Sequence, residues 1–178
     1  MFTRRGDSGE TDTAFGQRVS KGSTLIDIEG TVDELNSFIG FSASVSKWDD
    51  IRADLIASQR DIFTIGEHIL ADGKRRTISP DRTVWLEDRT KSYRSEVGKI
   101  TLFVLPGGSI EASALHMART VCRRLERMVV AHSQERKMPP EVLSYLNRLS
   151  SMLFMMALAT NRRLGVSEDI WLLRESHD

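Results

Sequence analysis

The 178-residue chain has one cysteine and no excess of either charge. Cys122 alone excludes an intrachain disulfide and is typical of a reducing compartment. Lysine and arginine number 25, as do aspartate and glutamate, which argues against non-specific nucleic-acid binding. No apolar run approaches the roughly 18 residues of a membrane span, and the polar N-terminus lacks a signal-peptide core. We expect a soluble, cytoplasmic protein with one domain over residues 1–178 and no membrane or nucleic-acid partner.

The familiar signatures of metal binding and acid–base catalysis are also missing. His68 and His116 are isolated, and His132 and His177 lie near the ends of predicted elements, without paired-cysteine or His-Glu-x-x-His spacing. No serine–histidine–acid set and no suitable carboxylate pair stands out. Cys122 lies on an apolar stripe, where it is expected to be a small core residue. An enzyme built on this sequence would need chemistry without a protein base.

Apolar spacing and helix-end signals predict an all-α fold, a five-helix up-and-down bundle of ferritin-like type over residues 29–170. The first helix is predicted to start at a capping box of Thr31 and Glu34 and to continue to Ala43. The other helices are predicted at 49–71, 81–97, from a Ser109 cap to about 133, and from 139–140 to 165. Residues 1–28 are predicted as a loop arm with a short extended piece at 24–28, and residues 100–105 as a strand before Pro106-Gly107-Gly108.

The arm begins with glycines among hydroxyl and charged residues, in residues 3–11. Consecutive backbone amides in such a segment can curl into a nest for phosphate oxygens. A flexible tail explains the composition equally well, and the segment is not a Walker loop, because no Gly-Lys-Ser/Thr ending follows. Lys21, further along the arm, could supply a cation to a polyphosphate.

The predicted fourth helix carries a charged face at residues 118–127. Arg119, Arg123, Glu126 and Arg127 fall on one side, beside an apolar stripe and not opposite to it. Arginines at the edge of a buried seam suit a partly desolvated anion, because guanidinium forks bind phosphate oxygens in pairs. The alternative is a solvated face held by weak neighbouring ion pairs. His116 either borders the same site or is an ordinary interior histidine.

Two further residues have open interpretations. Asp33 is either an exposed acid in the first turn of its helix or the partner of an arginine from the fourth helix. Phe103 precedes the rigid turn at 106–108, so its ring either meets a planar ligand or closes the end of the bundle.

Five segments together resemble the PduO-type ATP:cob(I)alamin adenosyltransferases. They are residues 3–11, 30–37, 103–109, 118–127 and 146–150. They occur in the order and at the spacing of that family and span nearly the whole chain. The chain differs from similar members where Ser151 and Met152 follow Ser150, since the family often has aspartate and tyrosine there.

The resemblance implies a homotrimer with active sites between neighbouring subunits. It implies transfer of the 5′-deoxyadenosyl group of ATP to the cobalt of cob(I)alamin, giving adenosylcobalamin and triphosphate, with Mg²⁺ accompanying the ATP. A reductase and an adenosylcobalamin-dependent enzyme are the implied partners, and no protein ligand of Mg²⁺ is indicated. The alternative is a trimeric carrier or sensor that holds ATP or a corrinoid without catalysis.

The resemblance also implies roles for individual residues. The ATP-binding set comprises Thr3, Arg4, Gly6, Asp7, Gly9, Thr11, Lys21, Arg123, Glu126, Arg127 and Asn147. The catalytic set is Asp33, Phe103, Arg119 and Glu126. Asp33 and Arg119 match an ion pair between subunits that borders the corrinoid, and Phe103 matches the aromatic residue that displaces the lower axial base of cobalamin.

Overall fold

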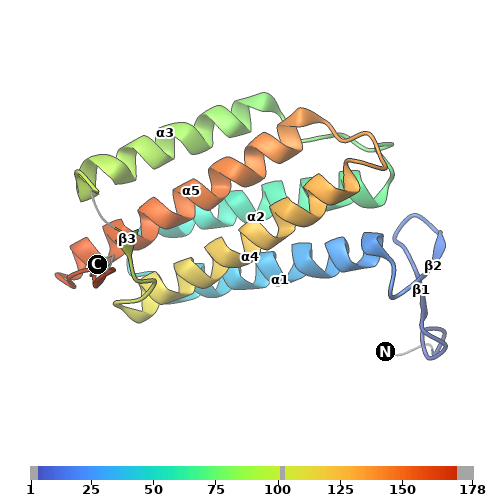
Figure 1. Ribbon diagram of the computed structural model, residues 1–178, viewed down its shortest axis with the longest axis horizontal. Helices are drawn as coiled ribbons and strands as arrows, with labels where there is room; N and C mark the ends of the chain where they lie inside the picture. The colour runs from blue at the N-terminus through green and yellow to red at the C-terminus, as the bar shows by residue number, and fades with distance from the viewer. Residues whose placement is uncertain (1–3, 101–102, 172–178) are drawn as a thin grey trace, which may run out of the picture.

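The computed structural model describes residues 4–100 and 103–171, which form five helices and two small antiparallel sheets. The elements are β1 Glu10–Asp12, β2 Arg18–Ser20, α1 Thr24–Val45, α2 Asp49–Leu70, α3 Pro80–Val97, β3 Phe103–Val104, α4 Ile110–His132, α5 Pro140–Arg163 and β4 Ile170–Trp171. Successive helices run in alternating directions along one long axis (Figure 1). The predicted five-helix up-and-down bundle is confirmed.

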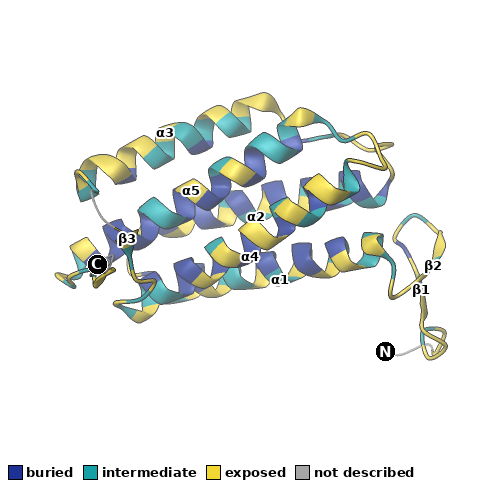
Figure 2. Cartoon of the chain, viewed as in Figure 1, coloured by how far each residue is buried: buried dark blue, intermediate teal, exposed yellow. Residues whose placement is uncertain are grey.

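Packing places the helices in the order α2, α1, α4, α5, α3. Their inner faces are buried and their outer faces exposed (Figure 2), as the apolar spacing of each helix requires. By length and composition α5 could cross a membrane, but 61% of its apolar window is buried inside the bundle. Its composition is explained by its central place between α4 and α3.

The first helix starts earlier than predicted, and the capping-box prediction is wrong. α1 begins at Thr24, so the extended piece predicted at 24–28 is helical and the arm ends at about Ser23. Thr31 lies inside the helix, where its hydroxyl donates to the Asp27 carbonyl at 2.8 Å. Glu34 accepts a hydrogen bond from Arg124 of α4. Burial of Ile28 against the core extends the helix backward past the local motif.

The other helix boundaries lie within one or two residues of their predicted positions. Ser109 caps α4, since its hydroxyl accepts a hydrogen bond from the Ala112 amide at 3.1 Å. Asp72 and Gly73 have positive φ values of 51° and 76° and end α2. Gly165, with φ of 70°, follows the end of α5.

Two buried carboxylates hold α2 against α3 and α5. Asp54 accepts hydrogen bonds from the Tyr93 hydroxyl and from Arg89, each at 2.6 Å. Asp61 accepts one from the Tyr145 hydroxyl at 2.7 Å. Burial raises the pKa of both phenols, so they remain neutral donors. These groups are satisfied within the bundle and have a structural role.

Candidate functional site

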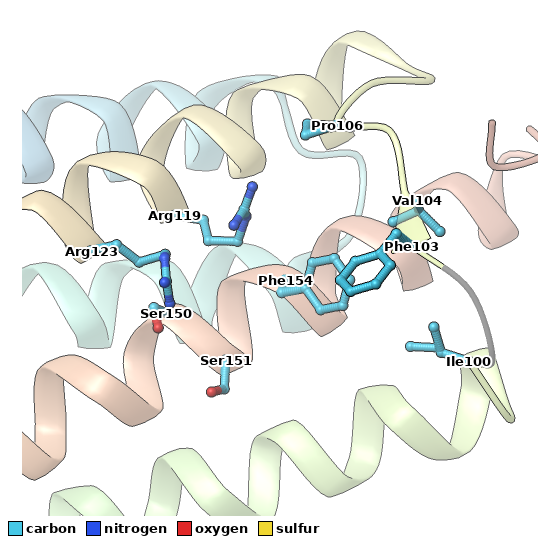
Figure 3. Close-up of a pocket in the computed structure, with 9 residues that line it drawn as sticks. All are labelled: Ile100, Phe103, Val104, Pro106, Arg119, Arg123, Ser150, Ser151 and Phe154. Atoms are coloured by element: carbon cyan, nitrogen blue, oxygen red, sulfur yellow. The ribbon is translucent and has the colours of Figure 1, made fainter. Parts of the chain in front are cut away.

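A pocket of about 460 Å³ opens where β3 and its flanking loop meet α4 and α5. We call it the aromatic–arginine pocket; it is lined by Ile100, Phe103, Val104, Pro106, Arg119, Arg123, Ser150, Ser151 and Phe154. Phe103 and Phe154 both contribute rings to its wall, and the two guanidinium groups come from α4 (Figure 3). Phe103 is 73% exposed, so its ring does not simply close the bundle end. The pocket combines apolar walls with positive charge.

Arg119 is the most constrained cation in this pocket. Its side chain is partly buried, and its Nε has no hydrogen-bond partner among the described residues. Its guanidinium carbon lies 5.8 Å from the centre of the Phe154 ring. Burial, and then the neighbouring Arg123, lower the pKa of Arg119. Among residues 4–100 and 103–171 no carboxylate forms an ion pair with this half-buried cation, and leaving such a charge unpaired is unfavourable.

His116 lies one helical turn before Arg119 and is only 3% exposed. In the part of the chain that the structure describes, neither ring nitrogen has a hydrogen-bond partner. Burial, and then the charge of Arg119, lower the pKa of His116 to about 4. The imidazole therefore stays neutral near pH 7. It packs 6.1 Å from the Phe154 ring, centre to centre, which places it behind the pocket wall.

The charged face of α4 lies beside the buried stripe, as the sequence predicted. The stripe consists of Ala118, Cys122, Leu125 and Val129, all buried. Asn147 of α5 donates to Glu126 at 2.9 Å and accepts from Arg148 at 2.6 Å. The structure thus brings together Glu126 and Asn147, two of the predicted ATP ligands, on the side of α4 that carries Arg123 and Arg127.

Cys122 is an ordinary core residue. Its side chain is completely buried, and the thiol donates to the Leu146 carbonyl at 3.3 Å. Burial raises the pKa of the thiol, which suppresses the thiolate form that a nucleophile needs.

The N-terminal arm folds as a β1–β2 hairpin at the end of the bundle opposite β3 (Figure 1). Lys21 donates through its ammonium group to the Gly6 carbonyl at 2.9 Å. The amides of Asp7 and Gly9 bond to loop carbonyls at 3.3 Å each, so these two amides are used within the loop. Gly9 has a positive φ of 82°. Thr3 lies outside the described residues.

Asp33 lies in a second pocket of about 500 Å³, between α1, α2 and the arm. We call it the α1–α2 groove; its lining is Ala14, Phe15, Ile26, Glu29, Gly30, Val32, Asp33, Phe63, Gly66, Glu67 and Leu70. No ion pair joins Asp33 to Arg119 within residues 4–100 and 103–171. The arginine of α4 that reaches α1 is Arg124, and it meets Glu34. The predicted site residues are therefore divided between two surfaces.

Phe154 is a pocket residue that the sequence interpretation missed. It follows Asn147 by seven residues and Ser150 by four, so all three lie on one side of α5. That spacing was a usable signal, but an aromatic residue among the methionines of α5 resembles ordinary core. Ser151 also lines the pocket.

We also looked for side chains that could bind a metal ion together. The described ranges contain no group of three or more His, Cys, Asp and Glu residues able to hold a metal ion.

By fold and site, the protein is a five-helix bundle with a positively charged, aromatic pocket. A sequence model of the family described as Cobalamin adenosyltransferase matches residues 1–160. The chain is 38% identical over 174 residues to the corrinoid adenosyltransferase of Bacillus subtilis, covering 94% of this chain and 90% of the relative. It is 38% identical over 172 residues to the cobalamin adenosyltransferase of Cupriavidus metallidurans, covering 96% and 93%.

Solved structures of corrinoid adenosyltransferases also resemble this chain. The chain matches a variant PduO-type ATP:corrinoid adenosyltransferase from Lactobacillus reuteri complexed with cobalamin and ATP, with a TM-score of 0.88 at 32% identity, covering 96% of this chain and 98% of that one. Another variant of that enzyme, complexed with ATP, gives a TM-score of 0.89 at 32% identity, covering 97% and 100%. The chain belongs to the cobalamin adenosyltransferase family, and it is an enzyme of the transferase class.

Proposed function

We propose that this enzyme transfers the 5′-deoxyadenosyl group of ATP to the cobalt of a reduced corrinoid and releases triphosphate. The observation that carries the proposal is the aromatic–arginine pocket, which is lined by both the exposed Phe103 ring and the half-buried Arg119, whose Nε has no hydrogen-bond partner in the described part of the chain. The printed names of the relatives and the ligands of the solved structures agree with it.

The active site is completed between subunits of a homotrimer. Two facts support this assembly: Asp33 and Arg119 line different pockets, and the arm lies at the far end of the bundle from β3. Asp33 of one subunit would then supply the missing anion beside Arg119 of its neighbour, and the arm would cover a nucleotide shared by both.

The ATP is held by the charged face of α4 and by the arm. Arg123 and Arg127 stabilise the charge that grows on the departing triphosphate, and Lys21 adds a third cation from the arm. Glu126 and Asn147, already hydrogen-bonded to each other, orient the nucleotide. Gly6, Asp7, Gly9 and Thr11, with Arg4, form the loop that folds over it. Mg²⁺ would enter bound to the ATP and would help to neutralise the charge of the phosphates.

The transfer step requires no protein base. The electron pair of Co(I) forms the cobalt–carbon bond at C5′, the C5′–oxygen bond breaks, and its electron pair leaves with triphosphate. No proton moves in this step, which agrees with a neutral His116 and an unreactive Cys122. The protein contributes by aligning cobalt with carbon, excluding water and stabilising the leaving group.

Formation of Co(I) depends on the aromatic side of the pocket. An axial ligand on cobalt opposes reduction of Co(II), so a ring that takes the place of the lower base makes the reduction easier. Phe103 is the ring proposed for this role, and its exposure in the same pocket as Phe154 supports the assignment. The electron comes from a reductase in the cytoplasm, and the product passes to an adenosylcobalamin-dependent enzyme.

A direct assay tests this function. Purified protein is given ATP, Mg²⁺ and chemically reduced cob(I)alamin, and the absorbance change of cobalt–carbon bond formation is followed together with triphosphate release. Equal amounts of both products support the transferase. Tight binding of ATP and cobalamin without turnover would contradict it and favour the carrier or sensor.

A further inference from the structure

Asn161, near the end of α5, is completely buried, and its amide makes four hydrogen bonds. Its oxygen accepts from the Ser109 amide at 2.9 Å and from the Ser109 hydroxyl at 2.8 Å. Its nitrogen donates to the Gly107 carbonyl at 3.0 Å and to the Glu168 carboxylate at 3.0 Å. Both lone pairs of the amide oxygen and both N–H donors are therefore used.

These partners belong to the two segments that flank the β3–β4 sheet, in which Phe103 lies. Gly107 and Ser109 form the turn that follows β3. Glu168 precedes β4, where Trp171 pairs with Phe103 in the antiparallel register. The two segments are also joined directly, since the Leu105 amide donates to the Asp169 carbonyl at 2.7 Å. One buried side chain thus connects both strands of the small sheet that carries the exposed ring.

The turn is shaped around the Asn161 amide. Gly108 has a positive φ of 92°, and a Cβ added there would lie only 2.3 Å from the Asn161 amide nitrogen. A Cβ added at the neighbouring Gly107 would meet no heavy atom within 4 Å. Glycine is therefore required at Gly108 both by the backbone conformation and by the close approach of Asn161.

We propose that Asn161 is a positioning residue for the reaction: by fixing the turn and β4 together, it sets the place of the Phe103 ring in the aromatic–arginine pocket. Asn161 does not line that pocket and acts only through the backbone of the β3–β4 sheet. This inference rests on the proposed function, because it assigns Asn161 to the step in which Phe103 takes the place of the lower axial ligand.

An amide is required here, and a carboxylate of the same size would not serve. Asn161→Asp keeps the oxygen that faces Ser109 but loses both donors, and it places a second carboxylate beside Glu168. Burial already raises the pKa of Glu168, so a further negative charge nearby is unfavourable. The turn and the β4 segment would separate, while α4 and its arginines keep their helical positions.

The test uses Asn161→Asp and Gly108→Ala, with Gly107→Ala as the matched control. Each full-length variant is loaded with ATP, Mg²⁺ and Co(II) cobalamin. The readouts are the four-coordinate Co(II) signal in magnetic circular dichroism, the KM for ATP, and turnover started from Co(II) or from chemically reduced Co(I). Thermal melting monitors folding.

We expect Asn161→Asp and Gly108→Ala to lose about tenfold or more of the four-coordinate signal and of Co(II)-dependent turnover, with the KM for ATP changed by less than about twofold. Turnover from Co(I) should fall less, and Gly107→Ala should match wild type. If either variant folds and keeps the wild-type signal, or if Gly107→Ala loses as much as Gly108→Ala, the inference is overturned. If wild-type protein itself gives neither product nor signal, the proposed function is overturned as well.

Discussion

Asp33 and Arg119 line two separate pockets of one subunit, the first in the α1–α2 groove and the second beside Phe103. If each active site takes Asp33 from one copy and Arg119 from the next, two inactive variants can complement each other. We expect Asp33→Lys and Arg119→Trp each to be inactive alone. Random mixed trimers should recover roughly a quarter of wild-type activity, because one interface in four receives both intact residues. Co-expressed, differently tagged chains provide the assay; a mixture that stays inactive would contradict the shared site.

Arg119→Trp should abolish turnover. The indole removes the half-buried positive charge and fills part of a pocket of about 460 Å³ that the corrinoid would occupy. We expect steady-state formation of adenosylcobalamin to fall by about 100-fold or more. Arg94→Trp provides the control, because Arg94 is an exposed arginine of α3 outside both pockets. Near wild-type rates for Arg119→Trp would refute the assignment.

Glu126→Lys should also prevent turnover, for a different reason. The substitution breaks the 2.9 Å hydrogen bond from Asn147 and places another cation among Arg123 and Arg127. The orientation of the nucleotide should be lost, with a fall of about 100-fold or more in kcat/KM for ATP. Glu126→Gln keeps an acceptor for Asn147 and should retain more activity. Equal rates for Glu126→Lys and wild type would show that this residue has no part in the site.

Phe103→Ala should retain ATP binding and lose much of the Co(II)-dependent activity. The ring is 73% exposed, so its removal costs the fold little, while cobalt regains its lower axial ligand. Isothermal calorimetry measures ATP binding, and magnetic circular dichroism measures four-coordinate Co(II). An undiminished four-coordinate signal in this variant would show that another group displaces the base.

The stability of the fold should depend on His116 below pH 6.5. The pKa of His116 is held at about 4 in the folded protein, against an ordinary value of 6.5. The unfolded chain therefore takes up a proton that the folded protein does not, and stability is lost as the pH falls from 6.5 toward 4. Between pH 7 and pH 5 the loss from this group is at most about 2 kcal/mol. Denaturant unfolding of wild type and His116→Leu at both pH values tests this: the variant should lose less stability, and equal losses would contradict it.

The bundle itself was predictable from the sequence because its signals are local. Pro140, Gly165 and the Ser109 cap mark helix ends wherever the helices pack. The predicted start of α1 was wrong because it relied on a local signal where packing is decisive. Thr31 and Glu34 satisfy a local capping pattern, but burial of Ile28 against the core favours a longer helix. Tertiary packing decided between two locally acceptable starts.

The candidate site was only partly predictable. The charged face of α4 followed from helical periodicity, and the roles of Asp33 and Phe103 followed only from resemblance to a family. Asn161 was missed because an amide beside Arg162 and Arg163 at a helix end is typical of a solvated position. Its partners in the turn are 52 and 54 residues away in the chain, and no local pattern indicates such a contact.

Burial of the single thiol makes the protein convenient for spectroscopic probes. Cys122 is completely enclosed and its pKa is raised, so maleimide reagents should leave the native fold unlabelled. A cysteine introduced at the exposed Ser8 would then take a fluorophore or spin label alone, without prior removal of the natural one. Movements of the arm during turnover could be recorded in real time from an otherwise unaltered enzyme.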